Sequence, residues 1–322
     1  MLKEKILILR TEQLGDFIVT IPVFNEIKKY YPYTELTIML KKINYDLAKN
    51  LDIFDKIIIY EDPFTQRNVS IFKIIKNPKG IVNTIKHFLW LRDNKYDLAI
   101  DFSGRKYNKI RFKLIKAKKK ILANPKDIRK LDERERVFKV VRELGLSYPK
   151  HPKFLNLDKD AEKKVDFIMK KYKLEDKKIV SVHPLTPLKE KNWPLEKFKE
   201  LFTILDKKNI VFLLLGTKEE YRETNQYIKN CENIINLMGK LSLFETYEII
   251  KRSDIFLGLD SGPLHMAKYT DTPLIAIFGN ENLEYIRWGP KRKIDKGFEK
   301  NNLNELEASN IAKEIIKKIK EK

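Results

Sequence analysis

The stretch DSGPLH (260–265) carries side chains that could hold a charged ligand. It follows an apolar run, so Asp260 falls where a strand should end and Ser261 where a helix should begin. Ser is a favoured N-cap residue, and Pro263 fits a first helical turn, whose amides have no intrahelical partners. Such free amides attract an anion, and Gly262 lets a phosphate approach the backbone. The alternative is an ordinary capped helix with a buried His265.

Asp16 is a second candidate, in the N-terminal run KILILRTEQLGD. A strand is predicted over 5–9 and a helix from Gly15 to Tyr31, which places the carboxylate in the first helical turn. The helix N-terminus would keep it ionised, so it could accept a proton from a sugar hydroxyl. A plain capping aspartate gives the same pattern.

Two further stretches place charge just after predicted strands. Lys191 lies in the loop of HPLTPLKEKNWP, where a lysine could pair with a phosphate as a point charge. Glu219 and Glu220 follow LLLGTK, where a carboxylate could accept hydrogen bonds from ribose hydroxyls. The spacing does not choose between the two glutamates. A solvated lysine and an ordinary first-turn acid remain the alternatives.

The elements that must position these residues follow a regular rhythm. Short β-branched runs alternate with amphipathic stretches, which is typical of βαβ units and parallel sheets. In open α/β sheets, ligands bind beyond the carboxyl ends of the strands, where the candidate residues fall. The predicted strands are 5–9, 35–40, 56–60, 97–102, 119–123, 178–183, 209–215, 232–238, 254–260 and 273–278.

The chain of 322 residues is long for one hydrophobic core, and a break is predicted near 146–160, where two prolines occur. We therefore predict two doubly wound α/β domains, at 1–150 and 155–300, with the cleft between them as the site. A last amphipathic helix is predicted within 301–322. The sequence Asp158-Lys159-Asp160 is interpreted as a helix cap rather than a metal site.

Positive charge is concentrated in the first half of the chain. The net charge is +21, and residues 1–150 hold 33 Lys and Arg against 18 Asp and Glu. The segment 105–120 has nine basic residues and no acidic one. If it is helical, Arg105, Lys109 and Lys113 share one face with Lys116 and Lys120. A basic face suits nucleic acid, acidic lipid or a phosphorylated sugar, whereas general enrichment in lysine would explain it without a partner.

The single cysteine, Cys231, cannot form an internal disulfide, which favours a reducing compartment. The N-terminus lacks a signal-peptide pattern, and no stretch reaches the length of a membrane span. We expect a cytoplasmic protein that is soluble or lies peripherally on the inner membrane. A nucleic-acid-binding protein is the charge-based alternative, but no motif of such a protein is found, so no nucleic-acid partner is expected.

Taken together, KILILRTEQLGD, KNWP, DSGPLHMA, TPLIAIFG and RWGP resemble glycosyltransferase family 9, the bacterial heptosyltransferases of lipopolysaccharide core assembly. Their order and spacing match over about residues 1–290. The resemblance implies a GT-B fold, in which two Rossmann-like domains face a cleft and the last helix crosses back to the N-terminal domain. The first domain would bind the acceptor and the second the nucleotide sugar. The reaction implied is inverting and metal-independent, and uses an ADP-sugar, such as ADP-heptose, without a further cofactor.

The resemblance also implies roles for individual residues. Asp16 matches the general base. On the donor side, the resemblance implies that Lys191 binds the donor phosphates and that Ser261 and Gly262 bind the diphosphate. It implies Asp260 and His265 as supporting groups of the donor pocket. It implies that Glu220, or else Glu219, contacts the hydroxyls of the donor.

The chain departs from the family pattern at one position, and the resemblance also leaves the acceptor and the reaction type to be considered. Family members often have Asn-Pro-Gly or His-Pro-Gly after the first strand of the second domain, where this chain has HPL (183–185). An acidic glycolipid acceptor would suit the basic surface at Arg105, Lys109 and Lys113. A hydrolase or an epimerase of sugar nucleotides could use the same scaffold.

Overall fold

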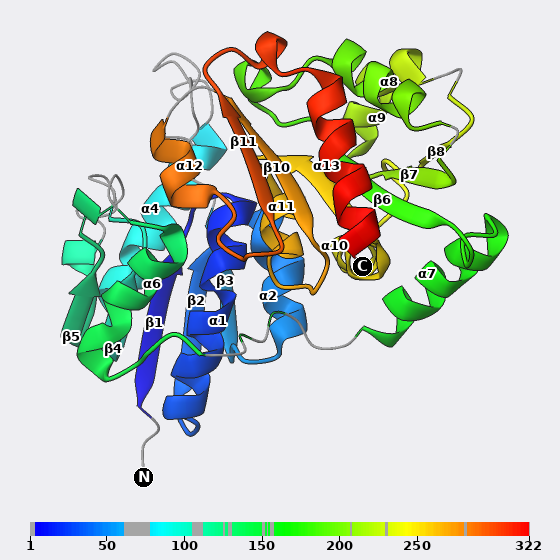
Figure 1. Cartoon of the computed structure of the whole chain (residues 1–322). Helices are drawn as coiled ribbons and strands as arrows, with labels where there is room; N and C mark the ends of the chain where they lie inside the picture. Colours follow the sequence, from blue (N-terminus) through cyan, green and yellow to red (C-terminus); the bar gives the residue numbers. More distant parts are fainter. Residues whose placement is uncertain are drawn as a thin grey trace. The chain divides into compact units, whose positions relative to one another are not determined.

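The computed structural model divides into two compact units, Met1–Asn156 and Leu157–Lys322, each with its own parallel sheet (Figure 1). The boundary falls within the stretch in which the two prolines predicted a break. The structure describes residues 4–60, 78–104, 112–124, 126–127, 131–149, 152, 154, 158–206, 208–228, 231–279 and 282–321.

The sheet of the first unit has the strand order β3-β2-β1-β4-β5, and all its pairings are parallel. The chain starts in the middle, builds one side and then the other, so the order reverses between β1 and β4. In doubly wound sheets this switch point is where ligands bind. The strands are β1 (Lys5–Arg10), β2 (Glu35–Leu40), β3 (Lys56–Ile59), β4 (Lys95–Asp101) and β5 (Lys116–Leu122).

Helix α1 follows β1 directly and buries an apolar face that includes Phe17, Phe24 and Ile27. It ends at Tyr30, just before Pro32, and packs against α6. The helical elements of this unit are α1 (Leu14–Tyr30), η1 (Lys42–Asn44), α2 (Tyr45–Leu51), α4 (Pro78–Asp93), α6 (Glu133–Val141) and η4 (Arg142–Leu144).

The described part of the basic segment does not place its lysines on one helical face. Lys116 and Lys120 lie on β5, the edge strand that pairs with β4, so the strand predicted at 119–123 is present and begins earlier, at Lys116. Lys113 is exposed in the helical turn 112–114, and the ammonium of Lys120 donates to its carbonyl (3.3 Å). Lysines are common on edge strands because they discourage pairing with other chains. Arg105 and Lys109 lie outside the described residues.

The second unit has a six-stranded parallel sheet in the order β11-β10-β9-β6-β7-β8. Its switch point lies between β6 and β9. The outer strand β11 was not predicted from the sequence, because KGFEK contains a single large apolar residue. The strands are β6 (Lys178–His183), β7 (Ile210–Leu214), β8 (Ile234–Asn236), β9 (Ile255–Leu259), β10 (Leu274–Gly279) and β11 (Lys296–Lys300).

The helical elements of the second unit include α7, whose start is capped by Asp158 as predicted: its carboxylate accepts from two backbone amides, each at 3.1 Å. No helix of either unit in the described ranges is both long and apolar enough to cross a membrane. The helical elements of the second unit are α7 (Lys159–Lys171), η5 (Lys189–Lys191), α8 (Leu195–Ile204), α9 (Lys218–Ile228), α10 (Leu243–Arg252), α11 (Gly262–Ala267), α12 (Asn282–Trp288), η6 (Leu303–Glu305) and α13 (Ala308–Glu321).

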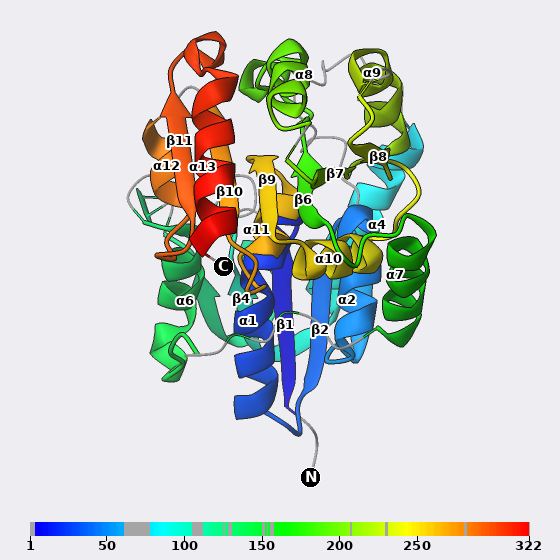
Figure 2. The same ribbon diagram turned by 45° about the vertical axis from the view of Figure 1, so that its right-hand side comes forward.

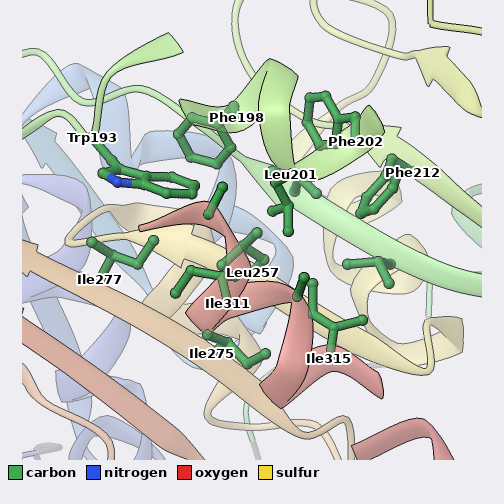
Figure 3. Packing of buried hydrophobic residues seen from close by; sticks show 14 of the residues in the cluster. Trp193, Phe198, Leu201, Phe202, Phe212, Leu257, Ile275, Ile277, Ile311 and Ile315 are labelled. Carbon is green, nitrogen blue, oxygen red and sulfur yellow. The ribbon is translucent and has the colours of Figure 1, made fainter. Parts of the chain in front are cut away.

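One face of this sheet is covered by α8 and α13, which lie side by side (Figure 2). Ile311 and Ile315 of α13 pack with Leu257 and Ile275 of the sheet and with the rings of α8 (Figure 3). The resemblance implied that the last helix crosses back to the first domain. That crossing stays a prediction. Within the second unit, the buried face of α13 belongs to the core, because its isoleucines recur at helical spacing and pack beside α8.

Candidate functional site

The first unit positions Asp16 at its switch point. Asp16 is in the first turn of α1, directly after β1, and is 8% exposed. The guanidinium of Arg10, the last residue of β1, donates to the Asp16 carbonyl from Nε (3.0 Å) and Nη2 (2.6 Å). The same Nη2 lies 3.8 Å from the carboxylate oxygen Oδ1. Arg10 therefore fixes both the backbone and the charge of the predicted base.

A buried network of ions holds Arg10 in turn. Arg10 has no exposed surface, and its Nη2 donates to Glu133 Oε1 at 3.1 Å. Glu133 also pairs with Arg136, which donates to the Phe102 carbonyl at 2.7 Å. Glu133 and Arg136 belong to α6, so the network ties the start of α1 to α6 and to the end of β4. Sequence reasoning missed all three charged residues; the signal was an arginine ending an otherwise buried strand.

The second unit gathers most of the predicted donor residues at its own switch point. Asp260 follows β9, and its Oδ2 lies 3.4 Å from the Lys191 ammonium. Its Oδ1 lies 3.5 Å from Nε2 of His265, on α11. Burial opposes ionisation of Asp260, but His265 and the ammonium groups of Lys191 and Lys268 outweigh it and lower its pKa to about 2. Asp260 is thus ionised at neutral pH and contacts the side chains of Lys191 and His265.

Ser261 is the N-cap residue of α11, as predicted, but its hydroxyl makes no capping bond. Its Oγ lies 3.0 Å from Nδ1 of His183, the last residue of β6. The other ring nitrogen of His183 lies 3.6 Å from Glu220 Oε2. Gly262 is the first residue of α11 and is half-buried. His183 was not predicted as a site residue; in the sequence it stands at a predicted strand end and begins the HPL stretch (183–185).

The structure distinguishes the two glutamates after β7. Glu219 is exposed, whereas Glu220 turns back and accepts from the Thr217 amide at 2.6 Å. Burial opposes ionisation of Glu220, but its contacts with His183 and Thr217 outweigh it and lower its pKa. A Cβ at Gly216 would lie 2.6 Å from the carboxylate, so the glycine leaves the space that Glu220 occupies.

The loop that carries Lys191 is fixed from the core. Trp193, two residues later, is fully buried and donates from Nε1 to the Leu306 carbonyl at 3.0 Å. Asn192 accepts from the Thr186 amide at 2.8 Å, which closes the loop across its base. The loop that carries Lys191 is therefore anchored to the core, and a lysine held in this way can act as a fixed positive charge beside Asp260.

Aromatic and basic side chains extend the site towards the end of α12. The Trp288 ring lies 4.7 Å from the His265 ring, and the Arg287 guanidinium stacks on Trp288 at 4.4 Å. Lys268 donates to the Trp288 carbonyl. With Lys191, these cations give the cluster a positive balance suited to an anion. Within the described ranges, no three or more His, Cys, Asp or Glu side chains are grouped as a metal site.

The two sheets with their switch-point residues define an α/β protein of the GT-B class, and solved structures share this architecture. The glycosyltransferase family 9 protein from Veillonella parvula has a TM-score of 0.77, with 99% of this chain and 98% of that chain covered at 15% identity. E. coli heptosyltransferase WaaC, solved with ADP, has a TM-score of 0.72, with 98% and 99% covered at 18% identity. The predicted fold class is confirmed.

The sequence comparisons give the family. The model of Glycosyltransferase family 9 (heptosyltransferase) matches residues 85–316. Lipopolysaccharide heptosyltransferase 1 of Campylobacter coli is 28% identical over an alignment of 302 positions, and the match covers 85% of this chain and 84% of the relative. Lipopolysaccharide core heptosyltransferase OpsX of Haemophilus influenzae is 25% identical over 309 residues, 89% and 82% respectively. The chain belongs to glycosyltransferase family 9 and is a glycosyltransferase, which confirms the resemblance seen in the motifs.

Proposed function

We propose that this enzyme transfers a heptose from ADP-heptose to a lipopolysaccharide-core or related acidic glycolipid, with inversion and without a metal or further cofactor. The names of the relatives support the sugar and the acceptor, and WaaC has been solved with ADP and with ADP-2-deoxy-2-fluoro heptose. The observation that carries the proposal is the cluster at the second switch point. There, Asp260 contacts both Lys191 and His265. The two ring nitrogens of His183 contact Ser261 and Glu220.

In this proposal the second unit stabilises the leaving group. The departing nucleotide diphosphate gains negative charge as the bond to the sugar breaks, and preorganised donors lower the barrier by binding that charge. Lys191 supplies an ammonium, and Ser261 and Gly262 supply a hydroxyl and a backbone amide. Asp260 holds Lys191 and His265 in place, and Glu220 accepts hydrogen bonds from donor hydroxyls.

The first unit supplies the base. Asp16 takes the proton of an acceptor hydroxyl as its oxygen attacks the anomeric carbon. The bond from this carbon to the diphosphate oxygen breaks in the same displacement, and the electron pair leaves with the diphosphate. One attack on one face inverts the anomeric centre. Arg10 keeps Asp16 oriented, so that the base needs no reorganisation during the step.

The acceptor side is proposed to meet the inner-membrane surface peripherally. Lys113 is exposed in the described part of the basic segment, and the excess of basic residues in the first unit would attract acidic lipid. Co-sedimentation with vesicles tests this idea: vesicles with anionic lipid should retain the protein at low salt more than neutral vesicles. Equal retention on both would refute it.

Transfer itself is tested with purified protein, ADP-heptose and a heptose-free lipopolysaccharide core acceptor. The expected product is the acceptor plus one heptose by mass spectrometry, with an inverted anomeric configuration by NMR and an undiminished rate in EDTA. Donor consumption without acceptor would indicate a hydrolase, and a changed sugar configuration still attached to nucleotide would indicate an epimerase. Either outcome would refute the proposal.

A further inference from the structure

We propose that His183 is a positioning residue that sets the direction of the Ser261 hydroxyl, and that binding of a nucleoside diphosphate places a proton on this histidine. The inference rests on the proposed function, because it takes the diphosphate to bind at Ser261. His183 lies at the end of β6 with 5% of its surface exposed, and its two ring nitrogens face different partners. Nδ1 is 3.0 Å from Ser261 Oγ, and Nε2 is 3.6 Å from Glu220 Oε2.

The carboxylate of Glu220 is held in position independently of the histidine. Its Oε2 accepts from the Thr217 amide at 2.6 Å, and Thr217 Oγ1 accepts from the Glu220 amide at 3.2 Å. This reciprocal pair caps the start of α9. Gly216 has φ +154° and no Cβ, which leaves room for the carboxylate. Glu220 therefore presents a fixed anion to Nε2.

A fixed anion beside Nε2 selects the ring tautomer. A neutral imidazole carries one proton, and the nitrogen that faces a carboxylate is the one that keeps it. Nδ1 is then a bare acceptor, so the Ser261 hydroxyl donates its proton to His183. What Ser261 offers to a ligand in this state is a lone pair, not a proton.

A phosphate oxygen also offers only lone pairs, so it does not fit Ser261 in that state. If His183 takes up a proton, Nδ1–H donates to Ser261 Oγ, and the hydroxyl proton turns towards the phosphate. The protonated ring keeps its contact with the Glu220 carboxylate, which compensates its charge. Diphosphate binding and protonation of His183 should therefore favour each other, as linkage requires.

The other charged groups near this ring have partners of their own. Asp260, which precedes Ser261, contacts Lys191 and His265, and Lys268 lies 3.4 Å from His265 Nδ1. Within the described residues, the His183 ring contacts Glu220 from α9 and Ser261 at the start of α11. The proton is expected on His183 because its Nδ1 contacts the hydroxyl that must reorient.

The test is calorimetry of ADP binding between pH 6 and 8.5 in buffers of different ionisation enthalpy, which counts protons taken up. The terminal phosphate of ADP titrates in the same range, so the informative quantity is the difference between wild type and His183→Asn. The asparagine amide can donate to Ser261 Oγ without titrating. We expect wild type to take up more protons than the variant, and its Kd to rise with pH by up to about tenfold more per unit. His87→Asn, a histidine on α4 of the other unit, should behave as wild type.

A second measurement tests the tautomer without ligand. The ring nitrogens of His183, assigned by comparison with His183→Asn in ¹⁵N NMR spectra, should show a proton on Nε2 and a bare Nδ1 in the free protein near pH 8, and protons on both with ADP. Equal proton uptake by wild type and His183→Asn, or a free ring protonated on Nδ1 alone, would overturn the inference while ADP binding leaves the proposed function intact. If wild type does not bind ADP, the proposed function fails first and the inference with it.

Discussion

Replacing Arg10 with methionine should separate the buried network from the rest of the enzyme. Arg10 lies between three carboxylates of the first unit: its guanidinium is 3.5 Å from Glu12, 3.8 Å from Asp16 and 3.1 Å from Glu133. Methionine fills much of the same volume but carries no charge and no donors. The variant therefore removes the positive charge and the two hydrogen bonds to the Asp16 carbonyl, without opening a large cavity.

The expected cost follows from what remains. Arg136 still pairs with Glu133, but one buried cation is left for three carboxylates. Breaking one partner out of a buried ion pair typically costs about 3–5 kcal/mol. Natural domains have only about 5–15 kcal/mol of stability, so the first unit should lose a large part of its own. Arg10→Lys keeps the charge but not the planar fork, so we expect a smaller loss, on the order of 1–3 kcal/mol.

The two variants also differ in what they do to catalysis. Arg10→Lys should fold, yet the Asp16 carbonyl loses its paired donors and the proposed base shifts. A misplacement of about 1 Å can reduce a rate on the order of 100-fold. We expect kcat to fall by about 10–100-fold, with the Kd for ADP unchanged because the residues proposed to bind the donor lie in the other unit.

Hydrogen exchange read by mass spectrometry measures the stability effect unit by unit. Peptides from β1, α1 and α6 should lose protection in Arg10→Met, whereas peptides from the second unit serve as an internal reference. Arg134→Met is the matched control: Arg134 is on the same helix as Glu133, but its half-buried pair with Asp132 leaves 22% of the arginine side chain exposed, so its loss should cost less, on the order of 1 kcal/mol. If Arg10→Met loses no more protection than Arg134→Met, the buried network does not hold the start of α1 and Asp16 in place.

Three further predictions concern the site. Asp16→Asn should abolish transfer while leaving the Kd for ADP within about twofold, checked by calorimetry; surviving transfer would remove Asp16 as the base. Gly216→Ala should displace the Glu220 carboxylate and cost about 1–3 kcal/mol, because φ is +154° and its Cβ would approach that group; an unchanged unfolding midpoint in urea would contradict this. The pKa of Asp260 is lowered from 3.8 to about 2, so its ionisation stabilises the fold above about pH 4, and this stabilising free energy, about 2 kcal/mol, is lost as the pH falls towards 2. In Asp260→Asn, the free energy of unfolding measured in acid should therefore fall less steeply over that range than in wild type.

Most of the fold was predictable because it depends on local patterns that persist in the folded chain. The central strands are continuous β-branched runs, since a parallel sheet is buried on both faces. The outer strand β11 escaped because half of it faces solvent, and its letters, KGFEK, resemble a loop. The basic segment was ambiguous for a different reason. A run of lysines fits a helix face and an exposed sheet edge equally well, and only the pairing of β5 with β4 decides.

The candidate site was predictable one residue at a time, but its contacts were not. Asp16, Asp260 and Ser261 stand at strand ends, which is a local signal, and the family motifs strengthened it. Arg10 carries a different signal, since arginine is rarely fully buried and nothing near it in the sequence shows that its partner, Glu133, lies on a distant helix.

His183 shows where sequence reasoning about the site stops. Its contact with Ser261 joins residues 78 positions apart, and it exists because β6 and β9 are neighbours in the sheet. Two strands that adjoin at a switch point deliver their last residues to the same place, whatever lies between them in the chain. A histidine at the end of the first strand can therefore orient a hydroxyl at the end of the fourth. The strand order, and not the motif around Ser261, determines which side chain directs the hydroxyl that is proposed to meet the phosphate.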